Sequence, residues 1–234
     1  MKRIVLASAT ILTLFASCSK KPFSAGPVVT EQRVLTDSIS AITVNGSMDV
    51  IITQDTSYEI EIHANEDVME YIETDVVNHE LIIDEELNHY TNKTVTIYVS
   101  AQYLNDISLK GSGDITGANL VTDHAFISLK GSGDIDLNFY SINDIDIDLK
   151  GSGDIKIQGI VDQNNTDLEG SGDVDCKDLI AIEANVDLEG SGDVNVYASD
   201  ELTIDVKGSG DVNYWGNPTT VNKNITGSGD INEM

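Results

Sequence analysis

The chain has 234 residues, of which 40% are hydrophobic and 6% aromatic, and its 40 acidic and 13 basic residues give a formal net charge of −27. This apolar fraction can build a core, which excludes a wholly disordered chain. So acidic a balance excludes nucleic acid as a partner, because a phosphate-binding surface needs lysines and arginines to release counterions. Two cysteines also exclude a disulfide-rich scaffold.

The start of the chain has the pattern of an export signal. Lys2 and Arg3 precede an apolar stretch of 12 residues that ends at Phe15, and such a stretch is too short to span the ~30 Å of a bilayer core as a helix. The small residues before Cys18 resemble the cleavage site of a bacterial lipoprotein signal, after which the cysteine becomes the lipidated N-terminus. We therefore expect residues 1–17 to be a lipoprotein signal peptide, and lipid on Cys18 to anchor the exported protein in the cell envelope, at the outer membrane. An ordinary secretory signal with an incidental cysteine is the alternative.

The next segments are a tether and a β-rich region. Residues 18–34 begin with a polar stretch to about Glu31 that is typical of a short linker. We expect residues 35–105 to form a β-rich cap, with mostly antiparallel strands, that covers the first edge of the region that follows. Its signals are strands at 58–62 and 94–100, a hairpin of 73–77 and 81–84 across Asn78 and His79, and a short helix at 65–71 with Asn65 as its cap.

Residues 106–234 contain an internal repeat. The tetrapeptide Gly-Ser-Gly-Asp occurs seven times at spacings of 18 to 20 residues, and each copy is followed by Ile or Val. On both sides of this motif, apolar and polar residues alternate with the period of two that marks a β-strand. A helix would need about 10–12 residues of 3.6-residue periodicity, and none is present. We therefore predict an all-β fold, a parallel β-helix or β-solenoid with coils of about 20 residues, each with two short strands that meet at the motif and room for a third.

Aligned on the motif, the apolar residues form four columns that we expect to stack as a continuous core. They stand four and two residues before the first glycine, and one and three residues after the aspartate; a degenerate copy of the pattern surrounds Gly46. Cys176 falls in the last column, between Ile157 and Val196, and we expect it to be a small buried core residue. Glycine suits the corner because a tight turn repeated in register needs positive φ.

Three segments resemble one bacterial family. They are Val44 to Val50, with the pattern Val-x-Gly-Ser-x-Asp-Val, the hairpin around Thr74 to Ile83, and Leu104 to Ile115, which contains the first full motif. Together they resemble the family called putative auto-transporter adhesin head domains, over about residues 35–234. The resemblance implies a right-handed parallel β-helix on cell-envelope proteins, which are often lipoproteins.

The aspartates of the motif form a column along the solenoid. Neighbours one coil apart are about 5 Å from each other, and two unit charges at that distance repel by roughly 0.8 kcal/mol in water. Hydrogen bonds from the Ser or Gly amides of the corners would offset this repulsion. The alternative is a row of Ca²⁺ sites, because carboxylate and carbonyl oxygens suit this cation. The column comprises Asp114, Asp134, Asp154, Asp173, Asp193, Asp211 and Asp230.

The residues do not form a catalytic pattern. Parallel β-helices include polysaccharide lyases and hydrolases, which act through a local cluster of carboxylates, or a metal with a basic residue, that breaks the repeat. Here every coil carries the same aspartate. We therefore predict no catalytic residue, and no cofactor apart from the Ca²⁺ alternative. The histidines, which are scattered with no metal-ligand spacing, are His63, His79, His89 and His124.

The sequence favours a non-enzymatic, lipid-anchored envelope protein that uses its solenoid surface for adhesion, interaction or structural support. A carbohydrate-binding or carbohydrate-cleaving β-helix is the alternative. We expect the protein to meet the membrane through its N-terminal lipid, to bind a protein or glycan partner, and to be able to form an oligomer. Trp215 is a candidate partner contact, because an exposed indole can stack on a sugar or a protein; a lid over the terminal coil is the other reading of this residue.

Overall fold

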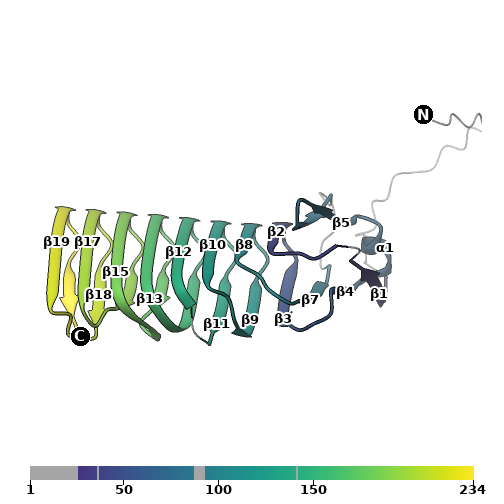
Figure 1. The fold of residues 1–234 in the computed structure, drawn as a ribbon. Helices are drawn as coiled ribbons and strands as arrows, with labels where there is room; N and C mark the ends of the chain where they lie inside the picture. Colours follow the sequence, from purple (N-terminus) through teal and green to yellow (C-terminus); the bar gives the residue numbers. More distant parts are fainter. Residues whose placement is uncertain (1–25, 36, 87–92, 141) are drawn as a thin grey trace, which may run out of the picture.

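The protein is a rod of stacked coils whose first end is closed by the N-terminal region (Figure 1). The computed structural model describes residues 26–35, 37–86, 93–140 and 142–234, and the expected signal peptide and Cys18 lie outside them. Strands make up 69% of the structure and form a β-solenoid of about 6 turns. The predicted all-β solenoid is therefore confirmed.

Each coil contributes a strand to what we call the pre-motif sheet, whose strands end at the first glycine of the motif. Neighbouring strands are parallel and in register, so equivalent residues of successive coils lie side by side. The strands are β2 (Ala41–Gly46), β8 (Asp106–Gly111), β10 (His124–Gly131), β12 (Ile142–Gly151), the second part of β13 (Ile155–Gly170), β15 (Leu179–Gly190), β17 (Glu201–Gly208) and β19 (Thr220–Gly227).

The strands that follow the motif form the post-motif sheet, which is also parallel. β13 belongs to both sheets, since it continues from one motif to the next and bends at Gly159, where φ is 144°. In this coil, the chain therefore passes from the post-motif sheet to the pre-motif sheet within one continuous strand. The other strands of the post-motif sheet are β3 (Asp49–Gln54), β9 (Ile115–Leu120), β11 (Ile135–Phe139), β14 (Val174–Cys176), β16 (Val194–Tyr197), β18 (Val212–Trp215) and β20 (Ile231–Glu233).

The core of the rod consists of the apolar columns that the repeat predicted. Ile127 and Ile147 lie on adjacent strands of one column and are almost completely buried. The register continues this column to Thr166, whose hydroxyl donates to Oδ1 of the buried Asn164, so one coil has a polar pair inside. Cys176 is fully buried as predicted, and burial raises the pKa of its thiol.

The corners stack glycine on glycine. Gly151 has a φ of 150°, and a Cβ atom on it would lie 2.1 Å from the carbonyl oxygen of Gly131. A Cβ on Gly153 would lie 1.8 Å from the carbonyl oxygen of Gly133. Positive φ explains the first glycine of the motif, as predicted, whereas the close approach of the next backbone is what requires the second.

The first coil of the rod comes from residues that the sequence assigned to the cap. Ile42 of β2 pairs with Ile107 of β8, and Val50 of β3 pairs with Ile115 of β9. The degenerate motif that begins at Gly46 therefore takes the place of a Gly-Ser-Gly-Asp corner in this coil.

Antiparallel strands and one short helix close the first end of the rod. The elements are β1 (Val28–Val34), β4 (Glu59–Asn65), α1 (Glu66–Met69), β5 (Ile72–Val77), β6 (Glu80–Glu85) and β7 (Val95–Ala101). β4 pairs antiparallel with β1 and β7, and β5 and β6 form the predicted hairpin, in which Asn78 and His79 have positive φ. β6 and β7 also pair in parallel with β2 and β3, and so cover the edge of the first coil.

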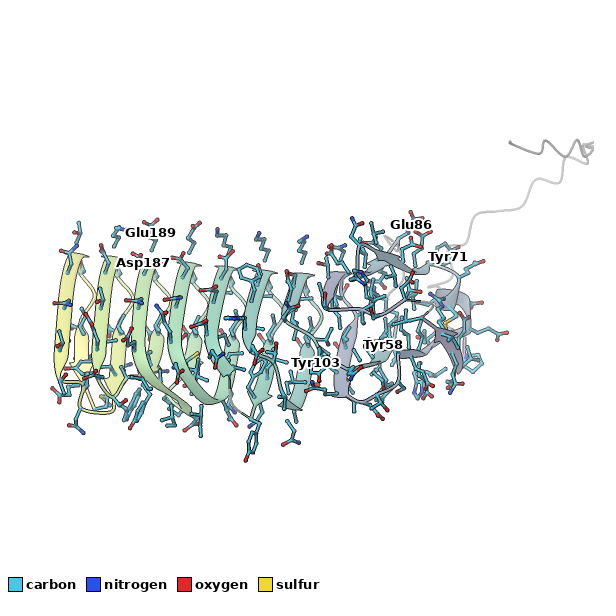
Figure 2. The ribbon with its side chains drawn as sticks, viewed as in Figure 1. Tyr58, Tyr71, Glu86, Tyr103, Asp187 and Glu189 are labelled. Carbon is cyan, nitrogen blue, oxygen red and sulfur yellow. The ribbon has the colours of Figure 1, made fainter. Side chains whose placement is uncertain are left out.

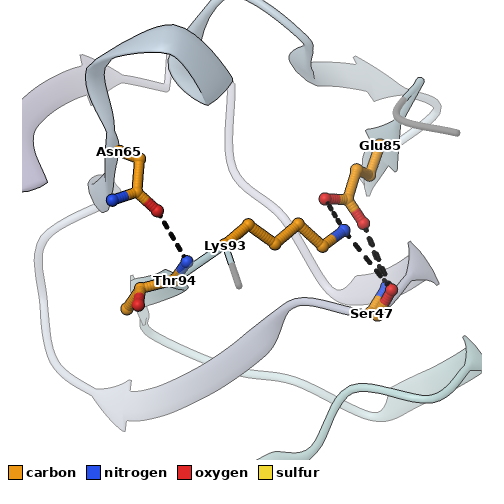
Figure 3. Close-up of polar contacts among 5 residues, drawn as sticks. All are labelled: Ser47, Asn65, Glu85, Lys93 and Thr94. Carbon is orange, nitrogen blue, oxygen red and sulfur yellow. Dashed lines mark hydrogen bonds and ion pairs between the residues drawn. The ribbon is translucent and has the colours of Figure 1, made fainter. Parts of the chain in front are cut away.

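The predicted helix cap differs from expectation in its hydrogen bonds. Asn65 is the N-cap of α1, but its side chain makes no capping bond. Instead, Nδ2 of Asn65 donates to the carbonyl oxygen of Gly26 at 2.7 Å. Its Oδ1 accepts from the backbone N–H of Thr94, also at 2.7 Å (Figure 3). The side chain thus joins three chain segments of the cap and leaves the short helix uncapped.

A buried ion pair links the cap to the first corner of the rod. The carboxylate of Glu85, whose side chain is 2% exposed, accepts from Nζ of Lys93 and from the backbone N–H and hydroxyl of Ser47 (Figure 3). Ser47 belongs to the degenerate motif, so Glu85 satisfies the corner that has no earlier coil beneath it.

Candidate functional site

The motif aspartates are joined to one another by backbone hydrogen bonds. Oδ1 of Asp134 accepts from the backbone N–H of Asp154, and Oδ1 of Asp154 accepts from that of Asp173, each at 2.9 Å. The same bond joins the other neighbouring copies at 2.8–3.0 Å, and Asp49 of the degenerate motif accepts from Asp114 at 3.3 Å. The donors are therefore the aspartate amides of the next coil, and not the Ser or Gly amides that the sequence suggested.

This arrangement gives the column an interaction that opposes its own repulsion. Each N–H points its partial positive charge at a carboxylate of the preceding coil, and a hydrogen bond to a charged acceptor is stronger than one to a neutral group. All copies lie at the corner edge of the rod, which we call the motif edge, and all are exposed except Asp211, which is half-buried. Among the described residues, no group of three or more His, Cys, Asp and Glu side chains is arranged to hold a metal ion.

A second charged column stands one residue before the motif. Lys150 lies 3.4 Å from Glu169, and Lys207 lies 3.1 Å from Glu189, each pair joining neighbouring coils. Figure 2 shows Glu189 projecting from the motif edge. These side chains are about half exposed, so each pair contributes less than about 1 kcal/mol to stability.

A groove on the outer face of the pre-motif sheet brings together aspartates that sequence analysis had read as ordinary polar strand positions. Partial burial raises the pKa of Asp167, and the neighbouring charges of Asp187 and Asp148 raise it further. Four of these aspartates stand three residues before the first glycine of their motif, and this shared position was the sequence signal that could have identified them as a column. They are Asp148, Asp167, Asp187 and Asp205. The groove is lined by Phe126, Asp146, Asp148, Asn165, Asp167, Asn185, Asp187, Thr203 and Asp205, among others.

The edge opposite the motif is formed by the turns between coils, and we call it the turn edge. Trp215 lies here, half-buried, and pairs with Tyr197 of the preceding coil. Tyr103 lies on the same edge near the cap and is 56% exposed (Figure 2). Tyr214 points inward and is buried, with its hydroxyl donating to Glu233 at 3.0 Å and Nζ of Lys223 over its ring. The aromatic residues of the last coils are thus divided between core and surface.

The described histidines do not come together. Each contacts a different partner, and His89 lies outside the described residues. The contacts are His63 with Glu61 at 2.5 Å, His79 with the carbonyl oxygen of Ser38 at 2.8 Å, and His124 with Asp144 at 2.8 Å. In the part of the chain that the structure describes, no helix has the length and apolar character needed to cross a membrane.

The fold and its surface define a β-solenoid protein whose outward side chains repeat from coil to coil. The chain belongs to the family described as "Putative auto-transporter adhesin, head GIN domain", whose model matches residues 39–218. Membership of this family indicates an exported or cell-surface protein with an adhesin-like role. A search of curated proteins finds no match.

Three solved bacterial structures share the fold. A putative adhesin from Bacteroides fragilis is 23% identical, with a TM-score of 0.85 over 89% of this chain and 97% of its own. A putative lipid binding protein from Parabacteroides distasonis is 24% identical, with a TM-score of 0.68 over 88% of this chain and 96% of its own. A putative adhesin from Parabacteroides merdae is 18% identical, with a TM-score of 0.62 over 89% of this chain and 97% of its own. These likenesses establish the solenoid with its cap as a shared architecture.

Proposed function

We propose that the protein is a non-enzymatic, adhesin-like protein of the cell envelope, whose rod presents its surface to a protein or glycan partner. The observation that carries this proposal is the uniformity of the surface, where the motif aspartates repeat from coil to coil with the same hydrogen bond. A catalytic site needs a cluster that breaks the repeat. A repeated surface can instead hold one partner at several points, which raises the strength of binding without any single strong site.

The proposal includes a lipid anchor at Cys18 in the outer membrane. Its support is the signal-like sequence of residues 1–17 and the linker that follows. The first described strand, β1, lies at the capped end of the rod (Figure 1). A lipid on Cys18 would therefore hold the cap near the membrane and direct the far end of the rod away from it.

Replacing the lipidated residue tests the anchor. Cys18→Ser should give an exported protein that fractionates as soluble and takes up no labelled fatty acid, whereas the wild type stays with the membrane. A membrane fraction and fatty-acid labelling that do not change in the variant would contradict the anchor, while leaving the binding role of the rod open to its own test.

The proposed binding role needs no cofactor. The motif aspartates act as a hydrogen-bonded spine, because each carboxylate has a backbone donor, whereas a Ca²⁺ site would need six to eight oxygen ligands gathered around one point. Ca²⁺ at the column remains the competing interpretation, and the effect of a chelator on thermal stability decides between them.

Adhesion by the purified mature chain tests the main proposal. Beads that carry the protein should attach to surfaces coated with envelope or host proteins or glycans, and beads with an unrelated acidic protein of similar charge should not. The protein should release no sugar products from polysaccharides. Release of products that disappears in Asp167→Asn or Asp187→Asn would overturn the non-enzymatic proposal.

A glycan bound in the groove of the pre-motif sheet is a second candidate partner, and one observation supports it. Phe126 is 39% exposed in the groove of the pre-motif sheet, beside amide and carboxylate side chains that can bond sugar hydroxyls. If the partner is a glycan bound in this groove, Phe126→Ala should abolish attachment to glycan-coated surfaces and leave attachment to protein-coated surfaces unchanged.

A further inference from the structure

The turn edge carries a continuous line of outward apolar residues, one from each of four successive coils, which we call the apolar ridge. Its register follows from the ladder, in which Ile160 pairs with Ile180. Phe139 pairs with Leu120, which places Tyr140 beside Val121, and a Cβ on Gly159 would meet the Phe139 carbonyl oxygen, which places Ile160 beside Tyr140. The ridge comprises Val121, Tyr140, Ile160 and Ile180.

The ridge residues face solvent and are not needed to fill the core. Tyr140 is 76% exposed, Ile160 57%, Val121 48% and Ile180 42%. The core at the same level is filled by their sequence neighbours, such as Phe139 and Leu179, which are buried. Ile182 and Tyr103, 47% and 56% exposed, extend the apolar surface at its margins. The other strongly exposed large apolar side chains among the described residues are dispersed over the cap, the pre-motif sheet and the last strands.

An unbroken apolar surface of this kind marks an interaction site. A monomeric, strongly charged protein gains solubility from polar side chains at exposed positions, and on the motif edge the outward columns are polar in every coil. The repeat does not require an apolar residue at the turn, because the polar side chain of Gln54 lies there in the preceding coil and donates to the carbonyl oxygens of Gln102 and Val121. The apolar ridge is thus a property of the surface and not of the folding pattern.

The charges beside the ridge select the partner. An exposed acid follows the ridge residue by two or three positions in three of the four coils: Asp123, Asp162 and Glu183. A second copy of this chain would place its own row of acids against this one, and an anionic membrane surface would also be repelled. A partner with an apolar stripe between lysines or arginines satisfies both features.

The length of the ridge matches a helix. Four coils spaced by about 4.8 Å span about 14 Å, which is the length of about 10 helical residues at 1.5 Å per residue. One turn of a helix rises about 5.4 Å, close to the spacing of the coils, so apolar residues on one helix face meet successive ridge residues.

We propose that the apolar ridge is the docking surface for a polypeptide partner, an amphipathic helix whose apolar stripe is flanked by basic residues. This inference rests on the proposed function, because it names the face of the rod and the class of partner through which the protein binds. Binding through the ridge leaves the motif edge free, so the spine of aspartates serves to stiffen the rod while the turns make the contact.

A synthetic peptide tests the proposal. The probe is a fluorescein-labelled 18-residue peptide of Leu and Lys, with Leu on one helical face, and binding to the mature chain is followed by fluorescence anisotropy. We expect micromolar binding that weakens with added salt, and no binding of the matching Leu and Glu peptide. Tyr140→Thr combined with Ile160→Thr should weaken binding at least tenfold. The matched control, Val34→Thr with Val77→Thr, removes two exposed apolar side chains from the cap and should leave binding unchanged.

A second pair of variants tests the charges without touching the apolar residues. Asp123→Asn with Asp162→Asn should weaken binding several-fold and reduce its salt dependence, and circular dichroism melting should show that all variants fold. Equal binding by the ridge variants and the wild type would overturn the proposal, as would failure of the basic peptide to bind. Binding of phosphatidylglycerol vesicles or of glycans that is lost in the ridge variants, without peptide binding, would assign the ridge to that class and overturn the helix.

The bead experiment separates this inference from the proposed function. If beads attach and the ridge variants attach equally well, adhesion stands and the ridge is the wrong face. If the peptide binds the ridge and the beads attach to no surface, the ridge binds a partner and the adhesive function is wrong.

Discussion

The rod and the cap of this protein are held together by opposite means. In the rod, each residue lies beside its own equivalent one coil away, in parallel strands, so Ile packs on Ile and Asp bonds to Asp. In the cap, β1, β4, β5, β6 and β7 pair mainly antiparallel, and unlike residues meet, as where Glu85 binds Lys93 and Ser47. The rod is stabilised by repetition, and the cap by particular contacts.

The difference has a consequence for how each region fails. A change in a rod corner disturbs the same contact on both sides, because every corner is stacked between two others. A change in the cap removes one contact that has no copy elsewhere, and exposes the first coil to pairing with another chain. The following substitutions separate these two behaviours, beginning with the largest expected effect.

The strongest test of the rod is Gly153→Ala. The new Cβ would lie 1.8 Å from the carbonyl oxygen of Gly133, and this obstacle is backbone, which cannot rotate away as a flexible side chain can. We expect a loss of about 4 kcal/mol or more in the free energy of unfolding, measured by denaturant titration. Ser152→Ala, an exposed position in the same corner, should change stability by less than about 0.5 kcal/mol. Equal stability of the two variants would mean that the coils are not stacked this closely.

The corresponding test of the cap is Glu85→Gln. Removing one charge of a buried pair leaves Lys93 without its partner, which costs about 3 kcal/mol. The neighbouring and exposed Glu86, labelled in Figure 2, provides the control, and Glu86→Gln should have little effect on the melting temperature. A double change, Glu85→Leu with Lys93→Met, should recover much of the loss, because it removes both charges together. No recovery in the double variant would point to the Ser47 contacts as the main contribution.

The aspartate spine is expected to give a smaller effect. Asp154→Ala removes the acceptor for the backbone N–H of Asp173 and should cost about 1 kcal/mol. Asp154→Asn keeps an acceptor oxygen and lowers the repulsion on both sides, so it should cost little. Thermal melting with and without a chelator completes the test. A fall of many degrees with chelator, reversed by micromolar Ca²⁺, would make the column a row of cation sites.

The smallest effect concerns the acidic groove and depends on pH. The pKa of Asp167 is raised in the folded protein, first by partial burial and then by Asp187 and Asp148, so the native state binds this proton more tightly than the unfolded chain does. Ionisation therefore reduces stability as pH rises through the folded pKa, and below the unfolded pKa the cost is absent. Asp167→Asn should be more stable than the wild type at pH 7, by less than about 0.5 kcal/mol, and equal to it near pH 3. Asp162→Asn, outside the groove, is the control for general loss of charge. A variant that is less stable at pH 7 would contradict this assignment.

The sequence by itself determined the parts of the protein that depend on its period. The seven Gly-Ser-Gly-Asp copies placed the corners, and the alternation beside them identified the buried columns, including Cys176 and Tyr214. The hairpin across Asn78 and His79 was also readable, because its strands are adjacent in the chain and its turn residues accept positive φ. Local pattern is sufficient wherever a residue's neighbours are its own copies or its near neighbours in sequence.

Tertiary structure decided the contacts between unlike or distant residues. Which backbone N–H donates to each motif aspartate depends on how far one coil is displaced along the next. The spacing of the motifs in the sequence does not reveal this displacement. The partners of Glu85 and Asn65 come from segments that lie apart in the sequence. The apolar ridge was hidden because the turns differ in length, so that Val121 and Tyr140 are 19 residues apart although the motifs that precede them begin 20 residues apart. A period set by the strands leaves the turns free to vary, and the structure alone brings their side chains into one line.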